Sequence, residues 1–328
     1  MSPLLAVPLF VGSLLVTLAA ARLFAQRLDR LGARFGFADV LVGLLTALAA
    51  DGPELSSALV ALAKGARSTS VGVLVGSNVF NLAAMIGLSA LVVGSVRLPR
   101  ETLLLEGVVG ALATLIVAGV LLGWVSPVVA VGLLLSAGVP YLLLLIYGAP
   151  SSPRMPFAGG LARVVAHRQP VKHSPRGQSD PPRHLLALVV LDVTLIVAGS
   201  AAMVQAALVL GARWDVSGAL LGVLILAPLT SLPNALTALR LAAARRGSAL
   251  VSETLNSNTI NLAAGVAVPA LFIGVSAITA VGRLDIAWLI AMTAVCLVLL
   301  ARPGGMRRVG ATVVIGLYVG FVVVQLAA

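Results

Sequence analysis

The chain has 328 residues, of which 60% are hydrophobic and only 10% are charged. Soluble domains carry about 25% charged residues, so this composition excludes an ordinary soluble domain. Because hydrocarbon offers no water to backbone groups, it predicts an all-α, polytopic membrane protein. The formal net charge of +11 does not indicate nucleic-acid binding, since the basic residues are scattered over several loops without interleaved aromatic residues.

Ten apolar stretches of roughly 20 residues, the length that crosses a bilayer, follow one another along the chain. They cover about 3–21, 37–63, 70–94, 102–122, 125–147, 185–208, 216–241, 249–273, 277–300 and 309–327. All lysine and arginine residues except Lys64, Arg67, Arg213 and Arg283 fall in alternate loops, beginning with the loop after the first stretch. The positive-inside rule places these loops in the cytoplasm. We therefore expect a plasma-membrane protein with both termini outside the cytoplasm.

The segment 149–184 interrupts the apolar pattern, because it is rich in Pro, Ser, Arg and His and has no sustained apolar run. We interpret it as a cytoplasmic linker between a first half, 1–148, and a second half, 185–328. Each half holds five predicted spans, and five is odd, so the second half enters the membrane with opposite polarity. The sequence thus predicts ten transmembrane helices in two inverted five-helix repeats, an architecture of secondary transporters.

A polar motif supports this repeat. The string GSNVFNLAA at 76–84 returns as NSNTINLAA at 256–264, so Ser77 pairs with Ser257 (257 − 77 = 180) and Asn81 with Asn261. Within each pair the Ser and Asn lie four residues apart and share a helix face. Their neutral oxygens suit hard cations such as Na⁺ and Ca²⁺. The alternative is that they hold helices together, and a nearby acid on a broken helix favours the ligand interpretation.

Proline interrupts the span before each copy of the motif, in AADGPEL at 49–55 and in APLTSLPNAL at 227–236. Proline removes a backbone donor and breaks the helix, which frees carbonyl groups for a cation. Asp51 and Glu54 flank the first break, and carboxylates inside a membrane span mark ion or proton pathways by default. For Asp51 the alternative is a position near the outer surface with access to solvent.

Three other acids are weaker candidates. Glu253 lies four residues before Ser257, and we favour a solvated residue at the helix end over a third site carboxylate. Asp192 and Glu106 lie in apolar spans but outside the repeat. All three histidines lie in the central linker, so the spans offer no histidine-based metal site and no base for a nucleophile. An intramembrane enzyme is therefore disfavoured.

These paired motifs resemble those of the cation/calcium antiporter superfamily, most closely its prokaryotic sodium/calcium exchangers. Each inverted repeat of that family carries a G-T-S-x-P-E-like helix break followed by a G-S-N-x-x-N-like helix. The resemblance covers nearly the whole chain outside 149–184. It implies a ten-helix antiporter, without a cofactor, that exchanges Ca²⁺ for Na⁺, or for H⁺ in related branches. Its expected partners are the lipid bilayer and small inorganic cations, and a monomer would suffice.

The resemblance also implies an ion site midway across the membrane. Carried over residue by residue, its ligands are Glu54, Ser77, Asn81, Thr230, Ser231 and Ser257, with backbone carbonyls near Ala47 and Ala227. Asn78 and Asn258, inside the repeated motif, are further candidates.

The chain departs from the family pattern at the charged positions. Asn234 stands where the second repeat of the family has glutamate, Ala50 and Asp51 replace the first Thr-Ser pair, and Asn261 stands where such exchangers often have an acid. Affinity for Ca²⁺ depends on ligand charge. If Asp51 joins Glu54, the site retains two acids and suits Ca²⁺. Glu54 alone would favour a monovalent cation/H⁺ or a Ca²⁺/H⁺ cycle, the alternative function.

Overall fold

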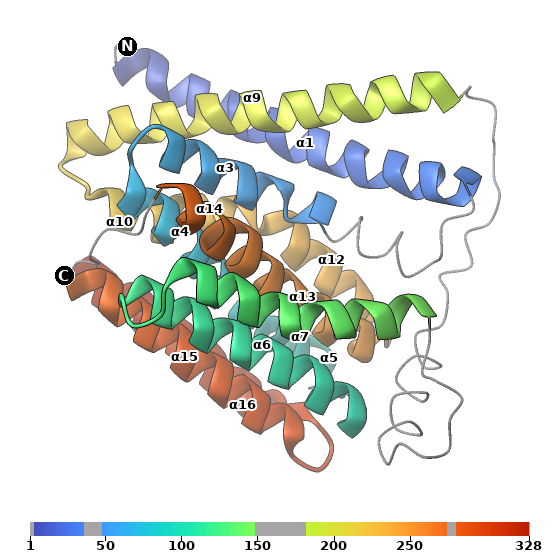
Figure 1. Ribbon diagram of the computed structural model, residues 1–328. Helices are drawn as coiled ribbons and strands as arrows, with labels where there is room; N and C mark the ends of the chain where they lie inside the picture. Colours follow the sequence, from blue (N-terminus) through green and yellow to red (C-terminus); the bar gives the residue numbers. More distant parts are fainter. Residues whose placement is uncertain (1–2, 36–47, 148–181, 274–279, 328) are drawn as a thin grey trace.

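The computed structural model describes residues 3–35, 48–147, 182–273 and 280–327. These residues form an all-helical membrane protein (Figure 1). Among them, six helices are long and apolar enough to cross a bilayer, and one bent pair, Gly218–Thr230 with Leu232–Ala243, adds a seventh candidate span. The predicted span 37–63 begins outside the described residues.

The helices of the first half occupy most of the described chain up to residue 147. In order they are α1 (Pro3–Phe35), α3 (Gly52–Ala63), α4 (Arg67–Asn81), the π-helical η1 (Leu82–Leu88), α5 (Ser89–Val93), α6 (Arg100–Leu121) and α7 (Pro127–Tyr147). The second half is built from α9 (Pro182–Trp214), α10 (Gly218–Leu220), the π-helical η2 (Leu221–Leu226), α11 (Ala227–Thr230), α12 (Leu232–Ala243), α13 (Gly247–Leu262), the π-helical η3 (Ala263–Ala267), α14 (Val268–Ile273), α15 (Ala280–Ala301) and α16 (Arg308–Ala327).

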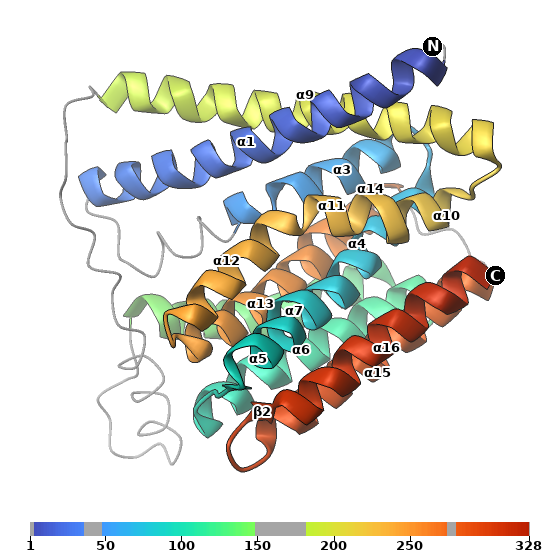
Figure 2. The same ribbon diagram turned by 180° about the vertical axis from the view of Figure 1, so that it is seen from behind.

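Two long helices, α1 and α9, lie side by side across one face of the remaining helices (Figures 1 and 2). They approach closely because Gly199 faces Thr17, where a Cβ on the glycine would lie 2.2 Å from the threonine oxygen. A salt bridge of 2.5 Å between Arg27 Nη1 and Asp192 Oδ1 also joins them. Asp192 therefore has a structural partner on α1.

The predicted boundary of the first helix is wrong. We expected the basic residues Arg22, Arg27 and Arg30 in a loop, but α1 continues through them to Phe35. The reason is that the stretch after residue 21 contains strong helix formers, and its apolar residues Leu28 and Leu31 pack against α9.

The helix α4 lies at the centre of the bundle and is buried along most of its length. It packs tightly against η2 because both helices present glycine at the contact. A Cβ on Gly222 would lie 2.4 Å from the Thr69 carbonyl oxygen, and one on Gly76 would lie 2.8 Å from the Cα of Val223. Small residues of this kind let membrane helices approach closely, and here they bring the two halves of the chain into contact.

A two-stranded antiparallel sheet links two loops at one end of the bundle. It pairs β1 (Ser95–Val96) with β2 (Met306–Arg307). Exposed arginines surround it, namely Arg97, Arg100, Arg245, Arg246, Arg302, Arg307 and Arg308. We call this the basic end. Both chain termini lie at the opposite end (Figures 1 and 2).

Candidate functional site

The site begins at the two predicted helix breaks. One helix ends at Ala50, and α3 starts at Gly52 with Pro53 in its first turn, which leaves Asp51 at the junction. In the second half, α11 ends at Thr230 and α12 starts at Leu232, which leaves Ser231 at the junction. The two helices of the second break meet at 45°. Asp51 and Ser231 are counterparts in the repeat (231 − 51 = 180), so both copies break at the same position.

The repeated asparagines join α4 to α13 through a symmetrical set of hydrogen bonds. Asn78 Nδ2 donates to the Asn258 carbonyl over 3.0 Å, and Asn258 Nδ2 donates to the Asn78 carbonyl over 3.1 Å. Asn81 Nδ2 donates to Asn258 Oδ1, and Asn261 Nδ2 donates to Asn78 Oδ1, each over 3.2 Å. These bonds give Asn78 and Asn258 a helix-joining role, because the side-chain amide of each residue donates to the backbone of the helix that carries the other.

The carboxylates of Asp51 and Glu54 are both buried, with 1% and 0% of the residue exposed. This excludes the alternative in which Asp51 lies near the surface with access to solvent. Asn234 Nδ2 bridges the two acids, donating to Asp51 Oδ1 over 2.8 Å and to Glu54 Oε1 over 3.2 Å. Those two oxygens are therefore no more than 6.0 Å apart (2.8 + 3.2).

Two residues of α13 complete the contacts to the acids. Ser257 Oγ donates to Asp51 Oδ1 over 2.6 Å, and Asn261 Nδ2 donates to Glu54 Oε2 over 2.5 Å. Each carboxylate of the first half is thus held by side chains of the second half. Ser77 and Ser231 lie beside Glu54, but neither hydroxyl makes a hydrogen bond at ordinary geometry.

The cluster contains buried oxygen atoms without a hydrogen-bond partner. They are Asp51 Oδ2, Ser77 Oγ, Asn81 Oδ1, Ser231 Oγ, Asn234 Oδ1 and Asn261 Oδ1. A buried polar atom left unpaired costs about 1–3 kcal/mol, so six in one cluster require an explanation. Carboxylate, amide and hydroxyl oxygens are the ligands that hard cations take, and a cation among them would satisfy several at once.

Electrostatics lead to the same conclusion. Among the described residues, no lysine or arginine forms a salt bridge with Asp51 or Glu54. Two unit charges 6 Å apart repel by about 3 kcal/mol at an effective dielectric constant of 20. Burying both charges adds a desolvation penalty. Among the described residues no group neutralises the pair, and a metal cation or a proton would do so.

The remaining predicted ligands have other positions. The Thr230 hydroxyl is buried and donates to the carbonyls of Leu226 and Ala227 within its own helix. The Ala227 carbonyl accepts that bond and another from Ser231 N, so it is not the free carbonyl that the break predicts. Ala47 lies outside the described residues.

Glu253 differs from its predicted place at the helix end. It lies six residues into α13 and is partly buried. The sequence suggested a helix end because Glu253 closely follows the basic loop residues, but α13 already starts directly after those residues.

One residue near the site escaped the sequence argument altogether. Ser57 is fully buried on α3, one turn after Glu54, and its hydroxyl has no partner. Its spacing of three residues from Glu54 is the signal that would have found it.

Comparison with known proteins places the fold and the family. The sodium/calcium exchanger protein family model matches residues 5–149 and 184–327. A putative antiporter, CaxA of Alkalimonas amylolytica, is 31% identical over 80 residues, a segment that spans 24% of this chain and 25% of that protein.

Two kinds of solved structure share the fold. The sodium-calcium exchanger NCX_Mj, soaked with 10 mM Na⁺ and zero Ca²⁺, matches with a TM-score of 0.59 and 19% identity over 98% of this chain and 99% of that one. The H⁺/Ca²⁺ exchanger CAX matches with a TM-score of 0.72 and 15% identity over 98% of this chain and 87% of that one. Since the family model covers both halves and omits only the central segment, the chain belongs to the sodium/calcium exchanger protein family.

Proposed function

We propose that the protein is a secondary active antiporter that exchanges Ca²⁺ for Na⁺ by alternating access at the Asp51–Glu54 site. The observation that carries the proposal is the buried pair of carboxylates, bridged by Asn234, in a cluster with six oxygen atoms without partners, one of which is Asp51 Oδ2. Two acids and neutral oxygens form a ligand set for one Ca²⁺ or for monovalent cations in its place. The chain shares its fold with NCX_Mj and CAX, which are named as a sodium-calcium exchanger and an H⁺/Ca²⁺ exchanger.

The proposed architecture is ten transmembrane helices in two inverted repeats. Its support is the matched position of the two breaks and the reciprocal contacts between α4 and α13. In this topology the basic end faces the cytoplasm of a plasma-membrane protein, and the termini lie outside. The polarity of the chain in its membrane can be tested by labelling cysteines introduced near each terminus.

The proposed mechanism follows from the electrostatics of the site. Bound cations neutralise Asp51 and Glu54, so the occupied site can be occluded, whereas the empty charged site carries a desolvation penalty when water is removed. Exchange is then favoured over leak. Movement of the paired helices α1 and α9 against the remaining helices would expose the site to one side and then the other.

A second candidate keeps the site and changes the counter-ion. Neither acid has a cationic partner among the described residues, and protons neutralise carboxylates as well as metal ions do. A Ca²⁺/H⁺ or a monovalent cation/H⁺ cycle would use this property. The missing acid at Asn234 also favours it, because fewer charges bind Ca²⁺ less tightly.

One experiment separates the candidates. Purified protein in proteoliposomes is loaded with Ca²⁺ or left empty, and Ca²⁺ flux is measured under an imposed Na⁺ gradient and, separately, an imposed H⁺ gradient. Flux driven by Na⁺ supports the first candidate and flux driven by H⁺ the second. Flux of Na⁺ or H⁺ that never moves Ca²⁺ would support the monovalent cycle, and no cation flux of any kind would refute antiport.

A further inference from the structure

Glu253 stands apart from the two buried acids in exposure and in its place on the helix. It lies on α13 at a spacing of four and eight residues before Ser257 and Asn261, so these three residues share one helix face. Ser257 and Asn261 are the residues that bind Asp51 and Glu54. Glu253 is partly buried, whereas Asp51 and Glu54 are fully enclosed.

The Glu253 carboxylate is coupled to the site through Asp51. Ser257 Oγ donates to Asp51 Oδ1 over 2.6 Å, and Glu253 precedes Ser257 by one helical turn. Asp51 keeps its second oxygen, Oδ2, buried and without a partner. A cation that reaches Asp51 would occupy that oxygen.

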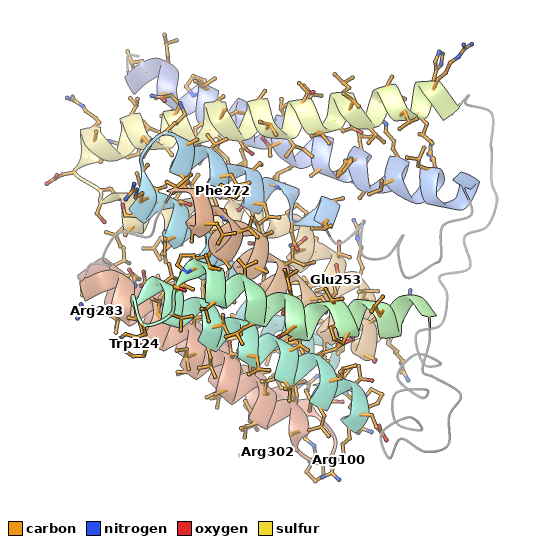
Figure 3. All side chains as sticks on the ribbon, in the orientation of Figure 1. Arg100, Trp124, Glu253, Phe272, Arg283 and Arg302 are labelled. Carbon is orange, nitrogen blue, oxygen red and sulfur yellow. The ribbon has the colours of Figure 1, made fainter. Side chains whose placement is uncertain are left out.

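The position of Glu253 along α13 places this acid toward one end of the bundle. The helix begins at Gly247, where a Cβ would lie 3.4 Å from Arg97 N, so its first turn belongs to the basic end. Figure 3 labels Arg100 and Arg302 at that end and Arg283 and Trp124 at the opposite edge. Glu253 is therefore on the basic side of Ser257 and Asn261.

The repeat has no equivalent acid on the other side. The counterpart of Glu253 is Val73 (253 − 73 = 180), which is fully buried in the apolar core on α4. One turn before the repeated serine, the first half thus has an apolar residue where the second half has a carboxylate.

We propose that Glu253 is an access site for cations, which it takes from the basic, cytoplasmic end and passes to Asp51. The proposal rests on the antiport function argued above. The seven exposed arginines of the basic end repel cations, so a carboxylate behind them restores a favourable local potential. Its ligand class is a partly hydrated Ca²⁺ or Na⁺ ion. Because the counterpart is Val73, the acid acts on one face of the membrane only.

The test compares the two faces of the membrane in one preparation. Glu253→Gln is reconstituted, and the KM for Ca²⁺ is measured from the side of the basic end and from the side of the termini, with sidedness set by blocking one orientation. The variant should raise the KM from the basic side about five- to tenfold, leave the KM from the other side unchanged, and leave kcat within twofold of wild type. Glu253→Asp, which keeps the charge on a shorter side chain, should raise the KM from the basic side by less than Glu253→Gln does.

Control variants distinguish failure of the access role of Glu253 from failure of the antiport function. Glu101→Gln, which removes an acid beside Arg100 at the same end, should change neither KM. If wild type moves Ca²⁺ but Glu253→Gln raises both KM values equally, or raises neither, the access role is refuted while antiport stands. If wild type moves no cation, the parent function has failed. If the Gln variant does not fold, Glu253→Asp decides, because an unchanged KM on both faces would refute the access role and a smaller one-sided rise would support it.

Discussion

The two copies of the repeated motif are equal in the contacts that join them and unequal in charge. Asn78 and Asn258 exchange hydrogen bonds of 3.0 and 3.1 Å, and Asn81 and Asn261 donate to the side-chain oxygens of Asn258 and Asn78, each over 3.2 Å. At the helix breaks the symmetry ends, because Glu54 faces Asn234. The contacts that hold two halves together must match, whereas the charge of a shared site can be supplied by either half.

The position of the acids has a structural consequence. With glutamate at both breaks, two carboxylates would face each other from opposite repeats. Here Asn234 instead donates its amide to Asp51 and Glu54 together. The second half thus acts as a hydrogen-bond donor and the first half supplies the negative charge. Three predictions test this division of roles, from the largest expected effect to the smallest.

Removing the charge of Glu54 should have the largest effect. Glu54→Gln keeps the size of the side chain but leaves one acid for the cation, so cation exchange should fall by more than about 100-fold. The protein should stay folded, because burying one charge fewer lowers the desolvation cost. Flux in proteoliposomes and the thermal midpoint of the purified protein measure the two effects.

Glu101→Gln is the matched control, since it removes one acid at the basic end of α6, outside the cluster. Its flux should equal that of wild type. Flux in Glu54→Gln close to the wild-type value would contradict the site assignment.

Moving the second acid from the first half to the second should have an intermediate effect. Asp51→Ser restores the residue type of its counterpart Ser231 and should weaken Ca²⁺ binding about tenfold or more, because one of two ligand charges is lost. Adding Asn234→Glu to that variant returns the charge count to two and should recover part of the affinity. Isothermal titration with Ca²⁺ measures both.

Asn234→Glu alone serves as the control for this exchange. It places a third carboxylate beside two others and removes the donor that bridges them, so it should lower both stability and flux. If Asp51→Ser binds Ca²⁺ as tightly as wild type, Asp51 does not replace the missing acid of the second half.

Much of this site can be predicted from the sequence, because it depends on which residue types stand at which positions along the chain. Proline fixes the two breaks, and the spacing of 180 residues pairs Ser77 with Ser257 without any coordinates. The partner of each side chain is not local. That Asn234 bridges both acids, or that Thr230 donates to its own helix rather than to the site, depends on side-chain direction and on the crossing of helices from different halves.

The positions at which helices begin and end could also not be predicted from the sequence. The extension of α1 to Phe35 depends on packing against α9, and the depth of Glu253 depends on where α13 begins. A charged residue near a predicted boundary is compatible with a loop or with a helix that continues. Tertiary contacts decide between the two.

The smallest expected effect is on the symmetrical part of the site. Asn78→Ala and Asn258→Ala each remove one donor of the reciprocal pair and one acceptor of the neighbouring asparagine. Hydrogen bonds between membrane helices contribute about 0.6 kcal/mol each on average, so each variant should lose about 1–2 kcal/mol of unfolding free energy. Each variant removes a different pair of bonds and keeps the backbone carbonyl that the other residue uses, so the loss in the double variant should be close to the sum. Equilibrium unfolding in mixed micelles measures all three, with Thr237→Ala, an exposed side chain on α12, as the control. Unequal losses for the two single variants would show that the asymmetry of charge extends into the contacts between the halves.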